Sequence, residues 1–547
     1  MWNARSARSW WCSKVLISQT LRVHGGECGR YNERVVDNTQ LLDEVASLRE
    51  LVATMRQALV SRDLQIEHLK LMLAKLRRAQ YGRSSEQLDE RINQLELSIE
   101  ELETSQARDL PTADFAERLQ DKPTRRPLPP TLPRETIPHP PVAADSPCPS
   151  CGGKLRYLGE DVTEILERVP EQFKVVRHLR PKLSCASCSQ IVQAPAPSRP
   201  IERGIAGPGL LAHILVSKYC DHLPLYRQSQ IYARDGIDLD RSTLAGMVGR
   251  CAALLAPLSD ALGRYVQAAA KIHADDTPIP VLSPGNGKTK TGRLWTYVRD
   301  DRPWADPSPP AVWFRYSPDR KGERPLEHLR HYHGILQADG YAGFNRLYET
   351  GRVVEVGCWA HVRRPFYDLS VAGDSPIARE ALERIQGLFA IEAEIRGRPP
   401  EERRAIRQAR AGPQLEDLQR WFQSTAAKLS RKSPLTIAIR YALTRWTALT
   451  RYRDDGRLEL ENNAAERALR AVALGRKNFL FLGADTGGER AAAIYSLIGT
   501  AKLNGLDPVA YLRYVLERIA DHPINRVEEL LPWNVVLHLA AKSALAA

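Results

Sequence analysis

The sequence predicts a multidomain α/β protein, and three patterns carry this prediction. An N-terminal segment repeats apolar residues in heptads, a middle segment holds two Cys-x-x-Cys pairs, and the C-terminal half alternates β-type runs with long helical stretches. The chain has 547 residues, of which 43% are hydrophobic and 26% charged. That length is enough for two to four domains with buried cores.

The N-terminal region divides into two parts. The first 34 residues show no helical periodicity, and we hypothesise that they arise from an upstream start codon, with initiation near Val35 or Val36. From residue 45 an apolar heptad pattern runs for more than four repeats, interrupted only by Arg62. Its two positions hold Val45, Val52, Leu59, Ile66 and Leu73, and Leu48, Met55, Leu69 and Leu76. This pattern predicts a coiled coil over 35–105, because an isolated helix would leave its apolar seam in water.

The oligomeric consequence of the heptads stays open at this point. A second apolar seam follows a break at YGRSS and is out of phase with the first; it comprises Leu88, Ile92, Leu95, Ile99 and Leu102. Either two protomers pair through the coiled coil, or the two helices of one chain pack as a hairpin. Residues 106–146 contain eight prolines between 123 and 141, which remove backbone donors and predict an extended linker.

Four cysteines after this linker predict a zinc-binding domain over 147–197. They form two C-x₂-C pairs, Cys148 with Cys151 and Cys185 with Cys188, separated by apparent strands. Four thiolates suit tetrahedral structural Zn²⁺, whereas a redox dithiol would need a thioredoxin-like context that is absent here. The other five of the nine cysteines are scattered, and we expect free thiols at Cys12, Cys28, Cys220, Cys251 and Cys358.

Residues 201–266 are predicted to be helical. A helix, a turn at Gly236 and a second helix capped by Asp240 or Ser242 are compatible with helix-turn-helix DNA binding, and equally with a helical hairpin that bridges two domains. The formal charge of +13 favours a polyanionic partner. The cations expected at phosphates in this region are Lys218, Arg227, Arg234, Arg241 and Arg250.

The region from about residue 268 is predicted to contain the sheet of the protein. β-branched and aromatic residues dominate KIHADDTPIPVL, RLWTYVRD and AVWFRYS, and a helix over 324–333, a strand ending at Asp339 and a strand near VVEVGCWAH follow. The helical stretch 378–453 reads as an insertion. After it, Asn462 and Asn463 are predicted to cap a helix that carries Glu466 one turn in.

Three carboxylates stand out in this region. Asp275 and Asp339 follow β-type runs, and Glu466 lies on the helix after the insertion. Hard divalent cations such as Mg²⁺ take oxygen ligands, and two such ions can activate the attacking oxygen and stabilise the leaving oxygen of a phosphodiester. If the fold brings these three side chains together, the chain could therefore cut and join nucleic acid.

The chain resembles the transposases of insertion sequence 66, which are DDE-type recombinases. The resemblance rests on stretches in family order: CPSCGG with a later CASC, SKYCDHLPLYRQSQIYARDGIDLDRSTL, HADDTPIPVL, GRLWTYVRD, GILQADGYAGFNRLYE, GCWAHVRRPF, ENNAAERALRAVALGRKNFLFLG and IYSLIGTAKLNGLDPVAYL. Two positions depart from the family pattern. The family usually has Glu where this chain has Asp276, and Asp where it has Glu461. The acids marked by the resemblance, Asp275, Asp339 and Glu466, are intact.

The resemblance implies a ribonuclease-H-like catalytic domain over 268–482, with the helical insertion at about 378–453, and a C-terminal helical region over 483–547. It implies a bacterial insertion-sequence transposase that cleaves element ends and joins them to target DNA with catalytic Mg²⁺ or Mn²⁺. Asp275 would bridge two ions, and Asp339 and Glu466 would each ligate one. Partners would be double-stranded DNA, a second protomer and small accessory proteins encoded nearby.

Several residues are left with two interpretations. Arg467, Arg470, Arg476 and Lys477 are expected to bind substrate phosphates, although a solvated basic loop explains the last two as well. His361 and Arg363 follow Cys358 and are equally compatible with a structural role. The alternative functions are a catalytically inactive zinc and coiled-coil DNA-binding protein and a metal-dependent nuclease without strand transfer. No run reaches the ~18 apolar residues of a membrane span, so we expect a cytoplasmic, nucleoid-associated protein.

Overall fold

The computed structural model describes residues 128–141, 146–169, 172–283, 288–373, 375–476, 478–479 and 481–546, together with isolated positions between 47 and 69. Those isolated positions are helical. Most of the predicted heptads, the second apolar seam and residues 1–34 lie outside the described residues. The coiled coil and the N-terminal extension therefore stay predictions.

A four-stranded sheet follows the N-terminal region. It consists of β1 (Arg134–Pro138), β2 (Leu155–Val169), β3 (Gln172–Cys185) and β4 (Ile191–Gln193), with β2 and β4 antiparallel to β3. β1 pairs with β3 in parallel, so the last part of the predicted linker is a strand. The reason is that Pro133 precedes this strand and Pro138 is its last residue, and proline is tolerated at the ends of edge strands. The extended linker predicted over 106–146 is wrong for these five residues.

Three helices come next: α3 (Pro208–Tyr219), α4 (Leu225–Arg234) and α5 (Arg241–Gln267). Gly236 makes the predicted turn with a φ of +76°, a backbone conformation that glycine adopts without steric cost. Asp240 precedes α5 as predicted, but its exposed side chain accepts no hydrogen bond from the helix, so side-chain capping by Asp240 does not occur. The helix-turn-helix interpretation stays a prediction.

By length and composition α5 resembles a membrane-spanning helix, the one such case among the described helices. Its apolar side chains, however, pack into the core of the molecule, where Leu244, Val248 and Leu255 are fully buried. A buried core helix meets the same criteria, so this feature is weak evidence for a membrane span.

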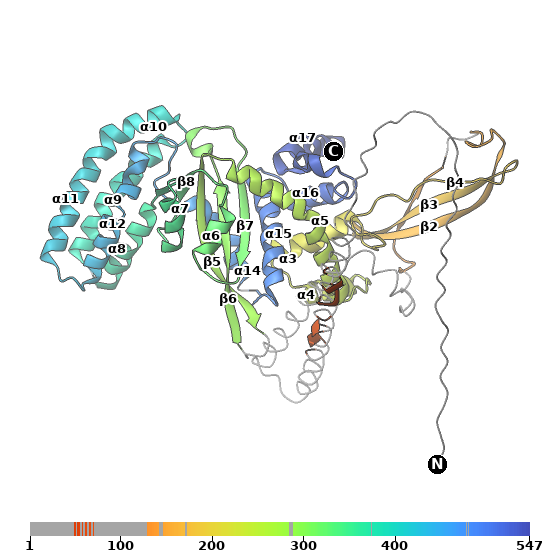
Figure 1. The fold of residues 1–547 in the computed structure, drawn as a ribbon, viewed down its shortest axis with the longest axis horizontal. Helices are drawn as coiled ribbons and strands as arrows, with labels where there is room; N and C mark the ends of the chain where they lie inside the picture. Colours follow the sequence, from red (N-terminus) through yellow and green to blue (C-terminus); the bar gives the residue numbers. More distant parts are fainter. Residues whose placement is uncertain are drawn as a thin grey trace, which may run out of the picture. The chain divides into compact units, whose positions relative to one another are not determined.

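The central element is a mixed five-stranded sheet in the order β7-β6-β5-β8-β9 (Figure 1). The first three strands are antiparallel neighbours, and β8 and β9 run parallel to β5. The strands are β5 (Lys271–Ser283), β6 (Lys288–Arg299), β7 (Ala311–Ser317), β8 (Gly334–Gln337) and β9 (Val353–Val356). All five predicted strands are present, although β6 begins at Lys288, before its predicted run, and β8 ends at Gln337 and not at Asp339. The predicted contact between the first and fourth strands is confirmed.

Short helical elements connect these strands. They are η2 (Arg302–Trp304), α6 (Glu323–His328), η3 (Ala342–Phe344) and α7 (Asn345–Glu349). The helix predicted over 324–333 ends at His328, because the chain turns there to bury Leu329 and Tyr332 before β8.

The free edge of β7 is covered by a helix. The C-terminal region comprises α15 (Asp485–Leu503), α16 (Pro508–Leu516), η6 (Ile524–Leu530) and α17 (Pro532–Ala546). On α15 the buried hydroxyls of Ser496 and Thr500, one turn apart, bond the strand: the backbone N–H of Phe314 donates to Ser496 Oγ at 2.8 Å, and that of Val312 donates to Thr500 Oγ1 at 3.1 Å. An edge strand with unpaired backbone groups is prone to aggregation. The two hydroxyls give two backbone N–H groups of β7 hydrogen-bond partners.

Residues 356–460 build a second hydrophobic core, made of helices that lie side by side next to β8 and β9 (Figure 1). They are α8 (Trp359–Gly373), α9 (Pro376–Ile395), α10 (Pro400–Ile406), η4 (Arg407–Ala411, a π-helix), α11 (Gly412–Lys428), α12 (Pro434–Thr444), α13 (Trp446–Thr450) and η5 (Arg451–Arg453). The two ends of this helical segment meet, since the backbone N–H of Trp359 donates to the carbonyl of Leu460 at 3.0 Å. We call residues 359–460 the helical insertion.

A buried ion pair holds the insertion together. Arg407 is fully buried and bonds Glu392 with two nitrogens, at 2.7 and 2.6 Å, and it also donates to the carbonyls of Tyr452, Asp455 and Leu458. We expect Arg407→Ala to lower the free energy of unfolding by about 3–5 kcal/mol, because it removes the two short bonds to the buried Glu392 carboxylate, which keeps only the longer contact with Arg403 at 3.4 Å. Urea denaturation followed by circular dichroism measures this change. Arg410→Ala, which removes an exposed pair with Glu394, is the control and should change stability little; equal effects of the two variants would refute the prediction.

Candidate active site

The register of the central sheet brings the first two predicted acids together. In the parallel β5–β8 pair, His273 lies opposite Gln337. Asp275 and Asp339 each follow two residues later, so both come at the same edge of neighbouring strands. Burial raises the pKa of Asp275 to about 7, and the negative charges of Asp339, Asp276 and Glu466 raise it too, although the backbone N–H of Asp276 donates to the carboxylate at 2.7 Å. Three carboxylates therefore act on the protonation of Asp275.

Glu466 comes from α14 (Asn463–Gly475), which packs on β5 and β6. It lies in the first turn of this helix, where the helix dipole favours a negative charge. Asn462 precedes the helix. Its side chain, which the sequence predicts to cap the helix, makes no capping hydrogen bond. Instead Nδ2 donates to the carbonyl of Ala274 at 2.8 Å, and Oδ1 lies 3.1 Å from Nδ1 of His273.

Asn462 therefore ties the start of α14 to the strand that carries Asp275. It is fully buried, and its own backbone N–H donates to the sulfur of Cys358 at 3.2 Å. Burial lowers the pKa of His273 to about 3, so the imidazole is neutral and donates to the amide oxygen. The Asn462 side chain bonds the strand and does not cap the helix, because the buried polar groups of the strand need hydrogen-bond partners more than the half-exposed first turn of the helix does.

Removing this amide should disturb both stability and the alignment of the acids. We expect Asn462→Ala to lower the free energy of unfolding by about 2–4 kcal/mol, since it leaves polar atoms of His273 and Ala274 buried without partners. Thermal unfolding and denaturant titration measure the loss. The matched control is Asn463→Ala, because the Asn463 amide bonds only Glu461 among the described contacts. Similar losses in the two variants would show that Asn462 has no special role.

The loop that carries Asp339 is held by the helical insertion. Tyr441 of α12 donates its hydroxyl to the Asp339 carbonyl at 2.6 Å, and Arg445 donates to the carbonyl of Gly340 at 3.0 Å. Gly340 has a φ of +80°, and a side chain there would meet Arg445 at 2.5 Å. The Asp339 carboxylate accepts the backbone N–H of Tyr341 at 3.0 Å. Sequence reasoning missed these contacts, since Tyr441 lies in a helix far along the chain.

Asp276 and Glu461, the two positions that depart from the pattern, have different surroundings. The Asp276 carboxylate is 2% exposed and is bonded by Arg293 at 2.9 Å and by two nitrogens of Arg320 at 3.0 and 2.8 Å. It is thus neutralised by two guanidinium groups. Glu461 is half-buried, and burial together with the charges of Glu459 and Glu466 raises its pKa.

The four predicted zinc ligands lie close together at one end of the β2–β3 hairpin. Their sulfurs all lie within 4.8 Å of one another, with Cys148 and Cys188 at 3.6 Å and Cys151 and Cys185 at 3.3 Å. Sulfurs that share a tetrahedral Zn²⁺ at about 2.3 Å lie about 3.8 Å apart. The backbone N–H groups of Cys188 and Ser187 lower the pKa of the Cys185 thiol, which favours the thiolate form that binds metal. The donor set and spacing fit zinc.

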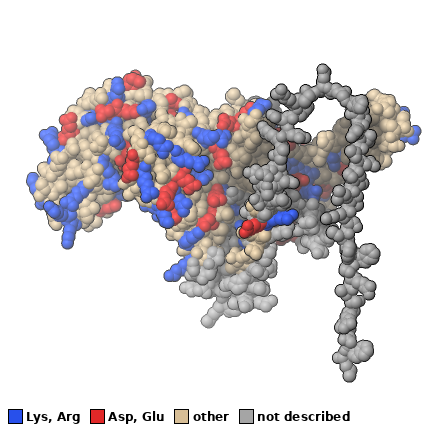
Figure 2. Space-filling model, in the orientation of Figure 1, with Lys and Arg blue, Asp and Glu red and all other residues tan. Residues whose placement is uncertain are grey.

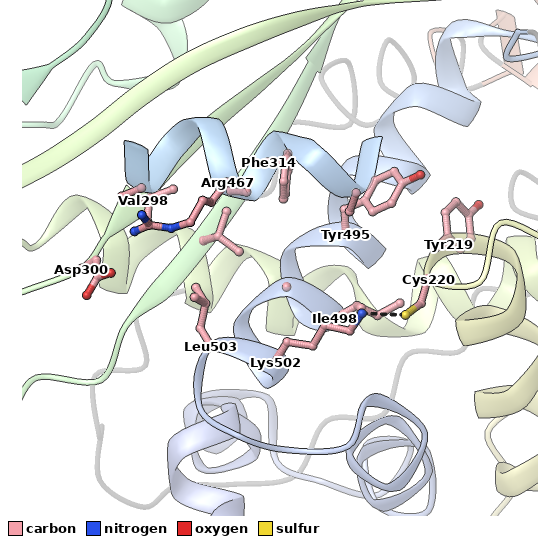
Figure 3. A pocket seen from close by; sticks show the side chains of 15 residues that line it. Tyr219, Cys220, Val298, Asp300, Phe314, Arg467, Tyr495, Ile498, Lys502 and Leu503 are labelled. Carbon is pink, nitrogen blue, oxygen red and sulfur yellow. Dashed lines mark hydrogen bonds between the residues drawn. The ribbon is translucent and has the colours of Figure 1, made fainter. Parts of the chain in front are cut away.

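The basic residues predicted to bind DNA are distributed over several elements. Arg467 reaches from α14 toward the Val298 and Asp300 end of a cavity of about 270 Å³ (Figure 3). Arg470 is exposed on the same helix, and Arg476 donates to the carbonyl of Pro278 on β5. Arg227 is exposed on α4 and Arg241 is half-buried on α5, whereas Lys477 lies outside the described residues. Figure 2 shows Lys and Arg interspersed with Asp and Glu over the helical insertion. Their contacts with DNA stay predictions.

Models of known protein families match most of the chain. The model described as "Transposase IS66 family" matches residues 203–490, which include Asp275, Asp339 and Glu466. The chain belongs to the IS66 transposase family. The C-terminal element of IS66 transposases matches 496–533, and a "zinc-finger binding domain of transposase IS66" matches 145–189, which contains all four clustered cysteines. A further model, described as "Transposase C of IS166 homeodomain", matches 68–137.

Two curated relatives of this IS66 family member match most of the chain. Proteins named uncharacterized protein y4hP and y4qI, both from Sinorhizobium fredii, are 43% and 38% identical over 504 and 519 residues. The first match covers 88% of this chain and 90% of the relative, and the second covers 92% and 94%. Uncharacterized protein y4jD of the same organism is 41% identical over 71% of this chain and 78% of its own length. The IS66 zinc-finger match and the four-cysteine cluster together support Zn²⁺ as a ligand of this protein.

Proposed function

We propose that this chain is a DDE transposase that cleaves the ends of an insertion sequence and joins them to target DNA. The observation that supports the proposal most is the β5–β8 register, which places Asp275 and Asp339 side by side, with α14 and its Glu466 packed on β5 in a region that matches the IS66 family. Support for a ribonuclease-H-like core comes from the strand order, in which three antiparallel strands precede two parallel ones beside the first strand. The proposal includes the predicted domain order, with the strand Arg134–Pro138 taken out of the linker and the insertion widened from 378–453 to 359–460.

The three carboxylates suit a hard divalent cation. Burial, followed by the negative charges of its carboxylate neighbours, raises the pKa of Asp275, and a bound cation would offset both effects. Asp275, Asp339 and Glu466 would hold Mg²⁺ or Mn²⁺, which when bound lowers the pKa of an attacking water or hydroxyl and stabilises the leaving oxygen. Asn462 keeps Glu466 at the strand of Asp275, and Tyr441 fixes the loop of Asp339. Asp276, neutralised by Arg293 and Arg320, has a structural role.

The reaction needs DNA held along the basic surface. We propose that Arg227, Arg241, Arg467, Arg470, Arg476 and Lys477 contact phosphates, and that the zinc-binding domain helps to hold element-end DNA. Two protomers would pair through the N-terminal coiled coil so that both element ends react together, with accessory proteins assisting. The reaction takes place on chromosomal DNA, so we place the protein in the cytoplasm with the nucleoid.

The test is a Mg²⁺-dependent cleavage and strand-transfer assay on labelled element-end DNA, with any accessory proteins encoded beside the gene included. Wild type should give joined products, and Asp339→Asn should bind the same DNA without giving any. Cleaved but unjoined DNA would favour a nuclease. DNA binding without products from either protein would favour the inactive DNA-binding protein.

A further inference from the structure

A second group of potential metal ligands lies beside the three acids. The sulfur of Cys358, a ring nitrogen of His361 and a carboxylate oxygen of Glu466 all lie within 4.8 Å of one another. Cys358 directly precedes α8, and His361 follows in its first turn, so both ligands come from one helix start. Glu466 comes from the first turn of α14, and the bond from the Asn462 N–H to the Cys358 sulfur holds the two helix starts together.

Two buried polar atoms in this group have no hydrogen-bond partner among the described residues. His361 Nδ1 and Glu466 Oε1 are both buried, and neither has a hydrogen-bond partner within the described structure. They face each other at 3.7 Å, which is too long for a hydrogen bond. Two ligands that bind one tetrahedral ion at about 2.1 Å lie about 3.4 Å apart. The separation therefore leaves the space that an ion between these atoms would occupy.

We propose that Cys358, His361 and Glu466 bind a Zn²⁺ ion distinct from the one in the four-cysteine cluster. A thiolate, an imidazole and a carboxylate form a donor set that suits zinc, whereas Mg²⁺ takes oxygen ligands alone. Binding would convert the buried Cys358 thiol to a thiolate and release its proton to solvent. Three protein ligands leave a fourth position open for water or a substrate oxygen.

This site shares one residue with the proposed transposase chemistry but does not depend on it. Oε1 of Glu466 faces His361, which leaves Oε2 for the carboxylate group formed with Asp275 and Asp339. Zinc at Oε1 would fix the orientation of Glu466, so the new site would position this acid. Metal content and DNA joining are separate measurements, and each proposal can therefore fail alone.

The test measures the zinc content of the full-length protein, purified without chelator, by inductively coupled plasma mass spectrometry. We expect wild type to carry two zinc ions per chain, and Cys358→Ser and His361→Ala to carry one each. Cys251→Ser, which replaces a buried cysteine outside both clusters, should keep two. Circular dichroism and thermal melting check the fold of each variant. Because His361 is half-exposed, His361→Ala should fold even if Cys358→Ser does not.

The outcomes separate the two proposals. One zinc ion per wild-type chain, or two ions retained in folded His361→Ala, would overturn the new site. Loss of one ion in His361→Ala but none in Cys251→Ser would establish it, whether or not the protein joins DNA. Absence of joined products from wild type with two zinc ions would count against the transposase chemistry alone.

Discussion

Asp275→Asn should abolish Mg²⁺-dependent cleavage and strand transfer while the protein still folds and binds DNA. Asparagine has nearly the shape of aspartate but cannot supply the charged oxygen that a divalent cation needs. Loss of one ligand from such a site removes several kcal/mol of transition-state stabilisation, so activity should fall by about 10³-fold or more. Single-turnover cleavage of labelled element-end DNA measures the loss. Cleavage at the wild-type rate would exclude Asp275 from the site.

The difference in stability between Asp275→Asn and wild type should depend on pH. In the metal-free protein the pKa of Asp275 is raised from 3.8 to about 7, mainly by burial. The stability that the protonated carboxyl contributes is fully present below about pH 4 and is lost as the pH rises through about 7. Asparagine does not titrate. Measured without divalent ions, the stability of Asp275→Asn relative to wild type should therefore rise between about pH 4 and pH 7 and level off above that.

The neighbouring carboxylate is the matched comparison. Asp276 is bonded to Arg293 and Arg320, so Asp276→Asn should destabilise the protein because it removes the buried carboxylate charge that both guanidinium groups bond. Asp275→Asn should thus be the more stable of the two variants near pH 8. Equal destabilisation by both would mean that Asp275 is a structural residue.

Cys148→Ser should remove the zinc of the four-cysteine cluster and unfold the segments around it. Apparent zinc-binding free energies of isolated zinc fingers are about 10–16 kcal/mol, and the cluster joins two short turns with few apolar contacts of their own. Zinc content should fall by one ion per chain. Limited proteolysis with mass spectrometry should reveal new cleavage near residues 146–153 and 185–193, while the central sheet stays protected.

The control for this prediction is Cys220→Ser, since the Cys220 sulfur contacts Lys502 and lies outside the cysteine cluster. It should keep the full zinc content and the wild-type proteolysis pattern. Unchanged zinc in Cys148→Ser would reject the four-thiolate site. New cleavage in both variants would show that the hairpin is sensitive to any thiol replacement.

The sequence predicted the central sheet because its signals are local. β-branched and aromatic runs mark each strand from β5 to β9, and the order of those strands limits which of them can be neighbours. The approach of Asp275 to Asp339 follows from that order. The four zinc ligands were predictable for the same reason, since each Cys-x-x-Cys pair fits within one tight turn.

The contacts that position the acids were not predictable from local sequence. Asn462 was expected to cap a helix and instead bonds Ala274, 188 residues away. Tyr441 reaches Asp339 across 102 residues. No periodicity marks such pairs, because each depends on how finished elements pack. The strand Arg134–Pro138 was missed for a related reason: proline-rich sequence indicates extended backbone but not which neighbour it pairs with.

The meeting of the two ends of the helical insertion, where Trp359 bonds Leu460, has a consequence for folding. A flexible loop of about 100 residues would cost about 4 kcal/mol of closure entropy to bring Glu466 back to β5. A folded module with adjacent ends avoids that cost only while it remains folded. Variants deep in the module, Arg407→Ala among them, should therefore weaken metal binding at the acids without touching them. This IS66 family member would lose the proposed chemistry through local unfolding of a part that contains none of the three acids.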